Sequence, residues 1–223
     1  MPTTLITGAN RGIGLALARE FQSKGHTVIA TARDPASAKE LKATGAELRA
    51  LDVSDPASIA ALAAGLKDRP IDYLINNAGL GDSGGFGKLD YDHFEELLRV
   101  NTIAPIRVLE ALTPNLAAGK AKIAAALSSV LGSIENANQD FSLAYRVSKA
   151  GLNMGLRSAA STLSAKGITL LALHPGWVKT DMGGANAPVE PADSAAGLFQ
   201  VITGAGPSKE LRFLDFEGKT LPW

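Results

Sequence analysis

Tyr145 and Lys149 are four residues apart, a spacing that places both side chains on one face of a helix. A free tyrosine has a pKa of about 10 and is a poor acid or base at neutral pH. A nearby ammonium favours the phenolate, but lowering the pKa toward 7 takes roughly 4 kcal/mol and a partly dehydrated site. Taken alone, the pair is more typical of a surface helix whose two side chains merely pack.

A second chemical pattern is the glycine-rich segment 7–14, Thr-Gly-Ala-Asn-Arg-Gly-Ile-Gly. Glycines at 8, 12 and 14 lack the Cβ atoms that would keep a diphosphate away from backbone N–H groups. An isolated glycine turn is equally an ordinary connection from a strand to a helix. Its position between an apolar run and a helical pattern, with alternating units after it, favours nucleotide binding.

Short apolar runs that alternate with helical patterns must position these residues. The runs that predict strands are Thr3–Thr7, Thr27–Ala32, Glu47–Leu51, Tyr73–Asn76, Lys122–Leu127, Ile168–Leu173 and Leu211–Asp215. Helices are predicted between them, with Asp55 and Asp90 as N-caps and Gly25, Gly45 and Gly167 as left-handed C-terminal residues. We therefore expect an α/β fold, a doubly wound parallel sheet of about seven strands with helices on both faces, in one domain over residues 1–223.

Six motifs in order resemble the short-chain dehydrogenase/reductase family along nearly the whole chain. They are the T-G-x-x-x-G-I-G turn at 7–14, Leu51-Asp52-Val53, Asn76-Asn77-Ala78-Gly79, Val100-Asn101-Thr102, Y-x-x-x-K at Tyr145 to Lys149, and Pro175-Gly176 with Thr180. The segments 174–177 and 213–223 look like the sniffer or C-factor branch of carbonyl reductases. The resemblance implies a Rossmann-type sheet and hydride transfer between NADP(H) and a small carbonyl or alcohol.

The resemblance also implies a role for each catalytic residue. Tyr145 is the proton donor to a carbonyl or the base toward an alcohol, and Lys149 holds the nicotinamide ribose and lowers the tyrosine pKa. Asn101 holds a water that links Lys149 to solvent, and Ser129 is the hydrogen-bond donor to the substrate oxygen. The residues implied in cofactor binding are Gly8, Asn10, Arg11, Gly12, Ile13, Gly14, Arg33, Asp52, Val53, Asn77, Ala78, Gly79, Tyr145, Lys149, Pro175, Gly176, Val178 and Thr180.

The serine departs from the family pattern, which usually places it thirteen residues before the tyrosine. Ser129 lies sixteen residues before Tyr145, and Ser133 lies twelve before it. We prefer Ser129, because the polar stretch 135–140 reads as a loop insertion and a strand end fixes a catalytic group better than a loop does. Ser128 is expected to point to the other side of the strand and to be structural.

The end of the second predicted strand bears on the choice of cofactor. An enzyme specific for NAD needs a carboxylate there for the ribose 2′-hydroxyl, and the aligned residue is Ala32. Arg33 follows and can bind a 2′-phosphate, with Arg11 as a second cation. Asp34 is the counter-evidence, although Asp34-Pro35 reads as the N-cap that opens the next helix. The sequence therefore predicts a preference for NADP(H).

Composition limits the other functions. Twenty-two basic and 22 acidic residues give zero net charge, so no nucleic-acid or anionic membrane partner is expected. The chain has no cysteine, and its three histidines have no ligand spacing, so we expect no metal and a cytoplasmic location. By resemblance, a homodimer or homotetramer through the long helices 91–117 and 145–166 is expected, although some members are monomers. A nucleotide-binding sensor of the C-factor type with incidental turnover is the alternative function.

The loops 79–87, 133–143 and 182–191 are expected to shape the substrate pocket. Loop conformation does not follow from periodicity, so the sequence does not identify the substrate.

Overall fold

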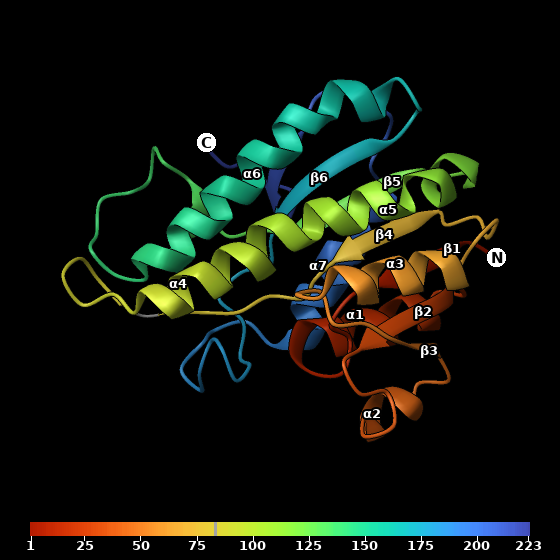
Figure 1. The fold of residues 1–223 in the computed structure, drawn as a ribbon, viewed down its shortest axis with the longest axis horizontal. Helices are drawn as coiled ribbons and strands as arrows, with labels where there is room; N and C mark the ends of the chain where they lie inside the picture. Colours follow the sequence, from red (N-terminus) through yellow and green to blue (C-terminus); the bar gives the residue numbers. More distant parts are fainter. Residues whose placement is uncertain (83) are drawn as a thin grey trace.

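All seven strands of the protein form one parallel sheet in the computed structural model, which describes residues 1–82 and 84–223 (Figure 1). The strands are β1 (Thr3–Ile6), β2 (Thr27–Ala32), β3 (Glu47–Ala50), β4 (Tyr73–Asn76), β5 (Ile123–Leu127), β6 (Thr169–His174) and β7 (Arg212–Asp215). Their order across the sheet is β3-β2-β1-β4-β5-β6-β7. The predicted doubly wound α/β sheet is confirmed, and each strand lies within a residue or so of its expected bounds. Position 83, inside the predicted substrate loop 79–87, lies outside the described residues.

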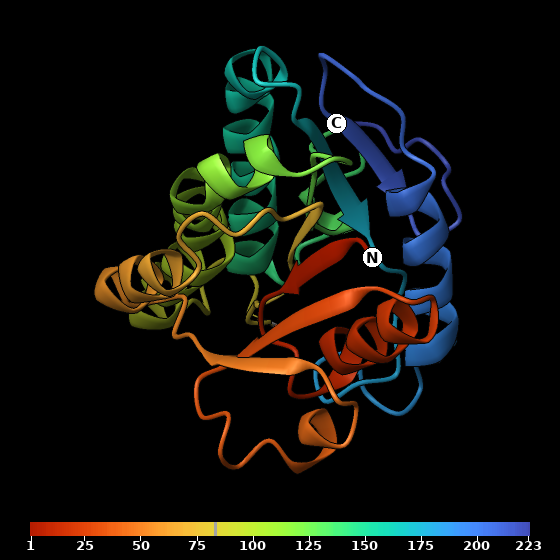
Figure 2. The same ribbon diagram turned by 90° about the vertical axis from the view of Figure 1, so that its right-hand side faces the viewer.

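Helices cover both faces of the sheet, as Figure 2 shows. They are α1 (Gly12–Ser23), α2 (Lys39–Lys42), α3 (Pro56–Gly65), α4 (Tyr91–Leu97), α5 (Ala104–Ala118), α6 (Leu143–Ser164) and α7 (Pro191–Thr203). The helices α3, α5 and α6 share a core on one face, and α1 and α7 share a core on the other. Of the helices in the described part of the chain, none is long and apolar enough to cross a membrane.

The apolar runs of the strands bury side chains on both faces of the sheet. Leu5 and Ile6 are neighbours on β1 and are both fully buried, yet they belong to opposite cores, because successive side chains of a strand alternate in direction. This is why these strands read as continuous apolar runs rather than as alternating ones.

The expected helix caps are confirmed with one exception. Asp55 accepts a hydrogen bond from the backbone N–H of Ala57, and Asp90 accepts one from that of His93. The prediction that Asp34 opens a helix is wrong, because its carboxylate instead accepts from the N–H of Ala36 in a tight turn. The helix α2 begins only at Lys39 and has no side-chain cap.

The long helix predicted over residues 91–117 contains a wide turn that periodicity does not show. Between α4 and α5 lies a π-helical segment, η1 (Leu98–Ile103), so the three segments form one rod with an expanded middle. Such segments commonly arise at functional sites. This one contains Asn101, which is fully buried.

Candidate active site

The glycine turn, Asn77 to Gly79, Ser129 and the segment 175–180 follow four neighbouring strands of the sheet, β1, β4, β5 and β6. The strand order reverses between β1 and β4, the place where ligands bind in doubly wound folds. Figure 1 shows the segments that follow β4, β5 and β6 extending to the same side of the molecule. The structure therefore brings the motifs of the first, fourth, fifth and sixth strands to one edge.

Hydrogen bonds from the segment after β4 hold the glycine turn after β1. The Thr7 hydroxyl accepts from the backbone N–H groups of Asn77 and Ala78, and the Asn77 amide donates to the carbonyls of Thr7 and Gly8. Gly8 has φ of +64°, and a Cβ there would lie 2.9 Å from the Cα of Ala78. A Cβ at Gly14 would lie 2.4 Å from the Asn77 amide nitrogen. Glycines at 8 and 14 are thus required by the close approach of the segment after β4. The turn precedes the N-terminus of α1, and the N-terminus of a helix is a type of site that binds a diphosphate.

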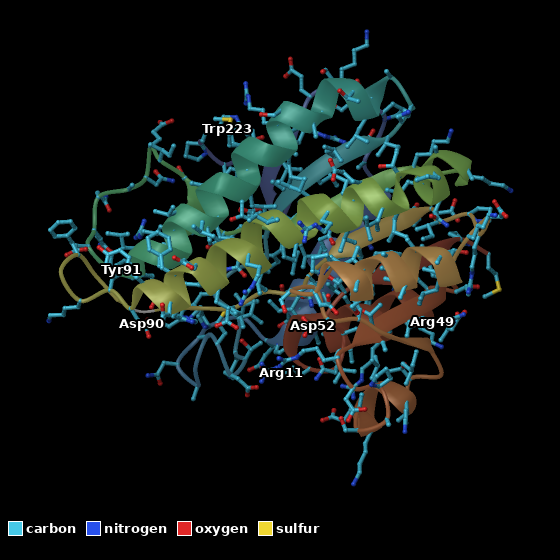
Figure 3. The ribbon with its side chains drawn as sticks, viewed as in Figure 1. Arg11, Arg49, Asp52, Asp90, Tyr91 and Trp223 are labelled. Carbon is cyan, nitrogen blue, oxygen red and sulfur yellow. The ribbon has the colours of Figure 1, made fainter. Side chains whose placement is uncertain are left out.

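The loop after β6 reaches across to the same turn. A Cβ at Gly12 would meet the Thr180 methyl group at 3.3 Å, so turn and loop are in near contact. The Arg11 guanidinium forms an exposed ion pair with Asp181 at 2.9 Å. Arg11, labelled in Figure 3, is therefore paired with this loop, and its contact with the cofactor phosphate stays a prediction. The sequence analysis did not single out Asp181. Its negative charge next to Thr180, a predicted cofactor residue, is a signal that could have marked it as part of the site.

The remaining predicted residues of the turn and of the loop differ in exposure. Asn10 is exposed and Ile13 packs against the core shared with α1. In the loop, the Pro175 carbonyl accepts from the Ser194 hydroxyl, and Gly176 has φ of +87°. Val178 is buried and pairs with Val189 in a short β-bridge.

The adenosine end of the predicted cofactor site lies by β2 and β3. Asp52 accepts hydrogen bonds from both the hydroxyl and the backbone N–H of Ser54, and these bonds hold the pKa of its carboxyl below the usual value. Val53 packs partly buried against the core. Arg33 is exposed and close enough to Asp52 to stabilise its charge. Figure 3 shows Asp52 and Arg11 on the same part of the molecule.

Ser129 and Tyr145, the predicted hydrogen-bond donor and the predicted acid, lie close together in the structure. Burial raises the pKa of the Tyr145 phenol above its usual value, and the nearby Ser129 hydroxyl opposes this with a smaller lowering effect. The pKa reduction inferred from the family resemblance is therefore not produced by these residues alone. A raised pKa keeps the phenol protonated at neutral pH, which is the form that donates a proton.

The neighbouring serines have structural contacts instead. Ser128 donates to the Asn153 side chain at 2.7 Å, which supports its expected structural role. Ser133 is buried, and its hydroxyl donates to the backbone oxygen of Trp223 at 3.3 Å. Of the two candidate serines, Ser129 is the one that the structure places against Tyr145.

Lys149 is a buried cation beside this pair. Its ammonium donates to the Leu127 carbonyl at 2.7 Å and lies 5.6 Å from the centre of the Tyr145 ring. Burial lowers the pKa of Lys149 from 10.5 to about 8. A Cβ at Gly79 would lie 3.7 Å from the ammonium nitrogen, so this glycine keeps the approach to Lys149 open.

Asn101 ties the π-helical segment to the catalytic helix and to the loop after β4. Its amide oxygen accepts from the N–H of Leu80, and its amide nitrogen donates to the Leu80 carbonyl and to the Ser148 hydroxyl. Both amide hydrogens are thus used within the protein. A water held by the Asn101 side chain therefore binds to the amide oxygen. The buried Ser148, next to Lys149, was missed by the sequence analysis because a serine inside a helix carries no distinctive pattern.

Close helix packing sets the distance between these groups. A Cβ at Gly155 of α6 would lie 2.4 Å from the Ile106 side chain of α5. Thr102 also donates from its hydroxyl to the Ser148 carbonyl at 2.7 Å. The glycine lets α6 approach the π-helical rod closely enough for Asn101 to reach the catalytic helix.

No group of three or more residues that could hold a metal ion occurs among the described residues. The candidate site consists of a half-buried tyrosine with a buried serine and a buried lysine, on the same edge of the sheet as the glycine turn. This set of groups can transfer a proton to or from an oxygen atom of a substrate.

Comparisons with known proteins agree with this geometry. A short chain dehydrogenase family model matches residues 2–190. C-signal of Myxococcus xanthus is 40% identical over 155 residues, which are 69% of this chain and 93% of that protein. The NADPH-bound carbonyl reductase from chicken fatty liver is 34% identical with a TM-score of 0.92, covering 100% of this chain and 99% of that one. Carbonyl reductase Sniffer of D. melanogaster is 31% identical with a TM-score of 0.92, over 100% of both chains. This chain belongs to the short-chain dehydrogenase/reductase family.

Proposed function

We propose that the protein is an NADP(H)-dependent carbonyl reductase that acts on a small carbonyl compound or the corresponding alcohol, with Tyr145 as acid and base. The observation that carries this proposal is the Tyr145 phenol, which has the Ser129 hydroxyl nearby and the buried ammonium of Lys149 5.6 Å from its ring centre. The structural similarity to an NADPH-bound carbonyl reductase supports it.

Each residue has a distinct part in the reduction. Bound NADPH supplies the hydride that the carbonyl carbon receives. The Tyr145 hydroxyl donates its proton to the carbonyl oxygen as negative charge develops there, and the Ser129 hydroxyl donates a hydrogen bond to the same oxygen. Lys149 uses one ammonium hydrogen on the Leu127 carbonyl, so the other two are available for ribose hydroxyls.

The preference for NADP(H) rests on the end of β2. Ala32 offers no carboxylate to a ribose 2′-hydroxyl, and the exposed Arg33 follows it. The fork of an arginine binds a phosphate with two parallel hydrogen bonds. Because Arg11 is paired with Asp181, we assign the main contact with the 2′-phosphate to Arg33.

Replacing Tyr145 by phenylalanine tests the proposal directly. The Tyr145→Phe variant removes the proton donor and keeps the ring, so kcat for carbonyl reduction should fall by about two to four orders of magnitude. The affinity for NADPH, measured by fluorescence titration, should change little because the glycine turn is untouched. Turnover near that of the wild type would exclude Tyr145 as the acid.

The similarity to C-signal keeps a second function in view, a nucleotide-binding sensor whose turnover is incidental. The intact set of Ser129, Tyr145 and Lys149 favours the enzyme, because a sensor has no need of a proton donor beside a serine hydroxyl and a buried ammonium. Consumption of NADPH with a panel of aldehydes, ketones and quinones separates the two functions. Tight NADPH binding without turnover of any of these compounds would support the sensor.

A further inference from the structure

Trp223 lies far along the chain from the reactive residues but packs beside the catalytic helix, as Figure 3 shows. Its ring stacks on Phe213 of β7, with ring centres 5.3 Å apart and planes 28° from parallel. The Arg157 guanidinium of α6 lies 5.0 Å from the centre of the Trp223 ring. Trp223 is thus held by one strand and one helix of the rigid scaffold.

The backbone of the same residue holds the segment that follows the catalytic serine. The backbone oxygen of Trp223 accepts from the N–H of Glu135 at 2.8 Å and from the Ser133 hydroxyl at 3.3 Å. The Ser133 hydroxyl in turn accepts from the N–H of Asn136. Residues 133–136, the first part of the predicted substrate loop 133–143, are therefore attached to Trp223.

This attachment leads back to Ser129 through a single short turn. Ser129 is the N-cap of the 3₁₀ turn η2 (Val130–Gly132), and its hydroxyl accepts from the N–H of Leu131. The carbonyls of Ser129 and Val130 accept from the N–H groups of Gly132 and Ser133. A Cβ at Gly132 would lie 2.9 Å from the Lys149 backbone, so the turn has no room to shift toward α6.

We propose that Trp223 is a positioning residue for the reaction: its docked indole fixes residues 133–136 and thereby the orientation of the Ser129 hydroxyl toward Tyr145. This inference rests on the roles proposed above for Ser129 and Tyr145. Trp223 touches neither residue, and it acts through Ser133, Glu135 and the 3₁₀ turn. Without the indole, residues 133–136 lose their attachment. The 3₁₀ turn before them can then shift in the direction away from α6.

The Trp223→Ala variant should lower kcat about tenfold, since a displacement of reacting groups by about 1 Å from a remote change is worth up to a hundredfold. The dissociation constant for NADPH should stay within about twofold of the wild type, because the glycine turn is on other strands. Trp223→Phe keeps a ring to stack on Phe213 and should restore most of the lost kcat. Ser133→Ala should have little effect, because the bond from Glu135 to Trp223 remains.

A double-mutant cycle of Trp223→Ala and Ser129→Ala distinguishes a positioning role of Trp223 from a merely structural one. The rate is measured as single turnovers with enzyme in excess over NADPH. If Trp223 acts through the serine hydroxyl, the tenfold effect of Trp223→Ala should nearly vanish in the Ser129→Ala background. Phe199→Ala is the matched control. It removes a comparable aromatic contact on the opposite face of the sheet, where the ring centres of Phe199 and Phe21 are 4.9 Å apart. This control should lower the melting temperature and leave kcat nearly unchanged.

Two results overturn the inference. One is an unchanged kcat in folded Trp223→Ala, and the other is an equal effect of Trp223→Ala with and without the serine hydroxyl. The failure of the proposed function is distinguishable, because it would appear as normal turnover in Ser129→Ala and Tyr145→Phe alone. Faster hydrogen exchange at residues 133–136 in Trp223→Ala, compared with Trp223→Phe, is the expected structural signature.

Discussion

The buried ammonium of Lys149 gives the stability of the cofactor-free protein a defined dependence on pH. Burial lowers its pKa from 10.5 to about 8, so the folded protein releases this proton well before the unfolded chain does. Below pH 8 both states carry the charge, and the desolvation destabilises the fold by roughly 3 kcal/mol. Between these two pKa values the unfolded chain binds more protons, so the contribution of this group to stability rises with pH.

The Lys149→Met variant isolates this contribution, because it keeps a long side chain without a charge. At neutral pH the variant is relieved of the desolvation cost but leaves the Leu127 carbonyl unpaired, which costs about 1–3 kcal/mol. The two effects largely cancel there. As pH rises from about 7 to about 10, the wild type should gain about 2–3 kcal/mol in free energy of unfolding relative to the variant.

Urea unfolding followed by circular dichroism at a series of pH values measures this difference. Lys67→Met is the matched control, because Lys67 is exposed and its difference from the wild type should be constant across the series. A constant difference for Lys149→Met as well would refute the argument, since it would mean that folding does not change the proton affinity of this ammonium.

Two further predictions follow from the site. Ser129→Ala should remove about 2.7–4 kcal/mol of transition-state stabilisation, whereas Ser133→Ala should be nearly silent in kcat/KM; the reverse order would show that the loop insertion is misplaced. Arg33→Ala should weaken the use of NADPH by about 2–3 kcal/mol and leave that of NADH nearly unchanged, as measured by kcat/KM with both cofactors. A wild type that prefers NADH would contradict the assignment of Arg33.

The sequence was sufficient for the central strands because they are short runs of apolar residues buried on both faces, whereas the edge strands β3 and β7 are mostly half-buried or exposed. The β5 strand, Ile-Ala-Ala-Ala-Leu, has all five residues buried. For Tyr145 and Lys149, the spacing of four residues predicted only that the two side chains share one face of a helix, and their place in the site was inferred from the family resemblance. Ser129 could be preferred over Ser133 because a strand end is rigid, and the structure places it at Tyr145.

Other features depend on contacts between distant segments. The pairing of Arg11 with Asp181 joins residues 170 positions apart, and no local pattern specifies it. The pKa of Tyr145 is set by the desolvation of its surroundings, which the spacing to Lys149 does not reveal. The turn at Asp34 was misassigned because an aspartate followed by proline begins turns as readily as helices.

The π-helical segment Leu98–Ile103 makes the length of this part of the chain as important as its composition. A wide turn of this kind contains one residue more than the α-helical turn it replaces. Deleting a single residue between 98 and 103 would restore regular α-helix with little change in the direction of α5, because five residues of an α-helix turn through nearly the same angle as six residues of the wider turn. The apolar face of α5 would therefore stay in the core. The deletion would remove the widened turn that contains Asn101, and with it the position from which this side chain reaches Leu80 and Ser148. A one-residue deletion is thus a change to the candidate site that spares the packing of the helices.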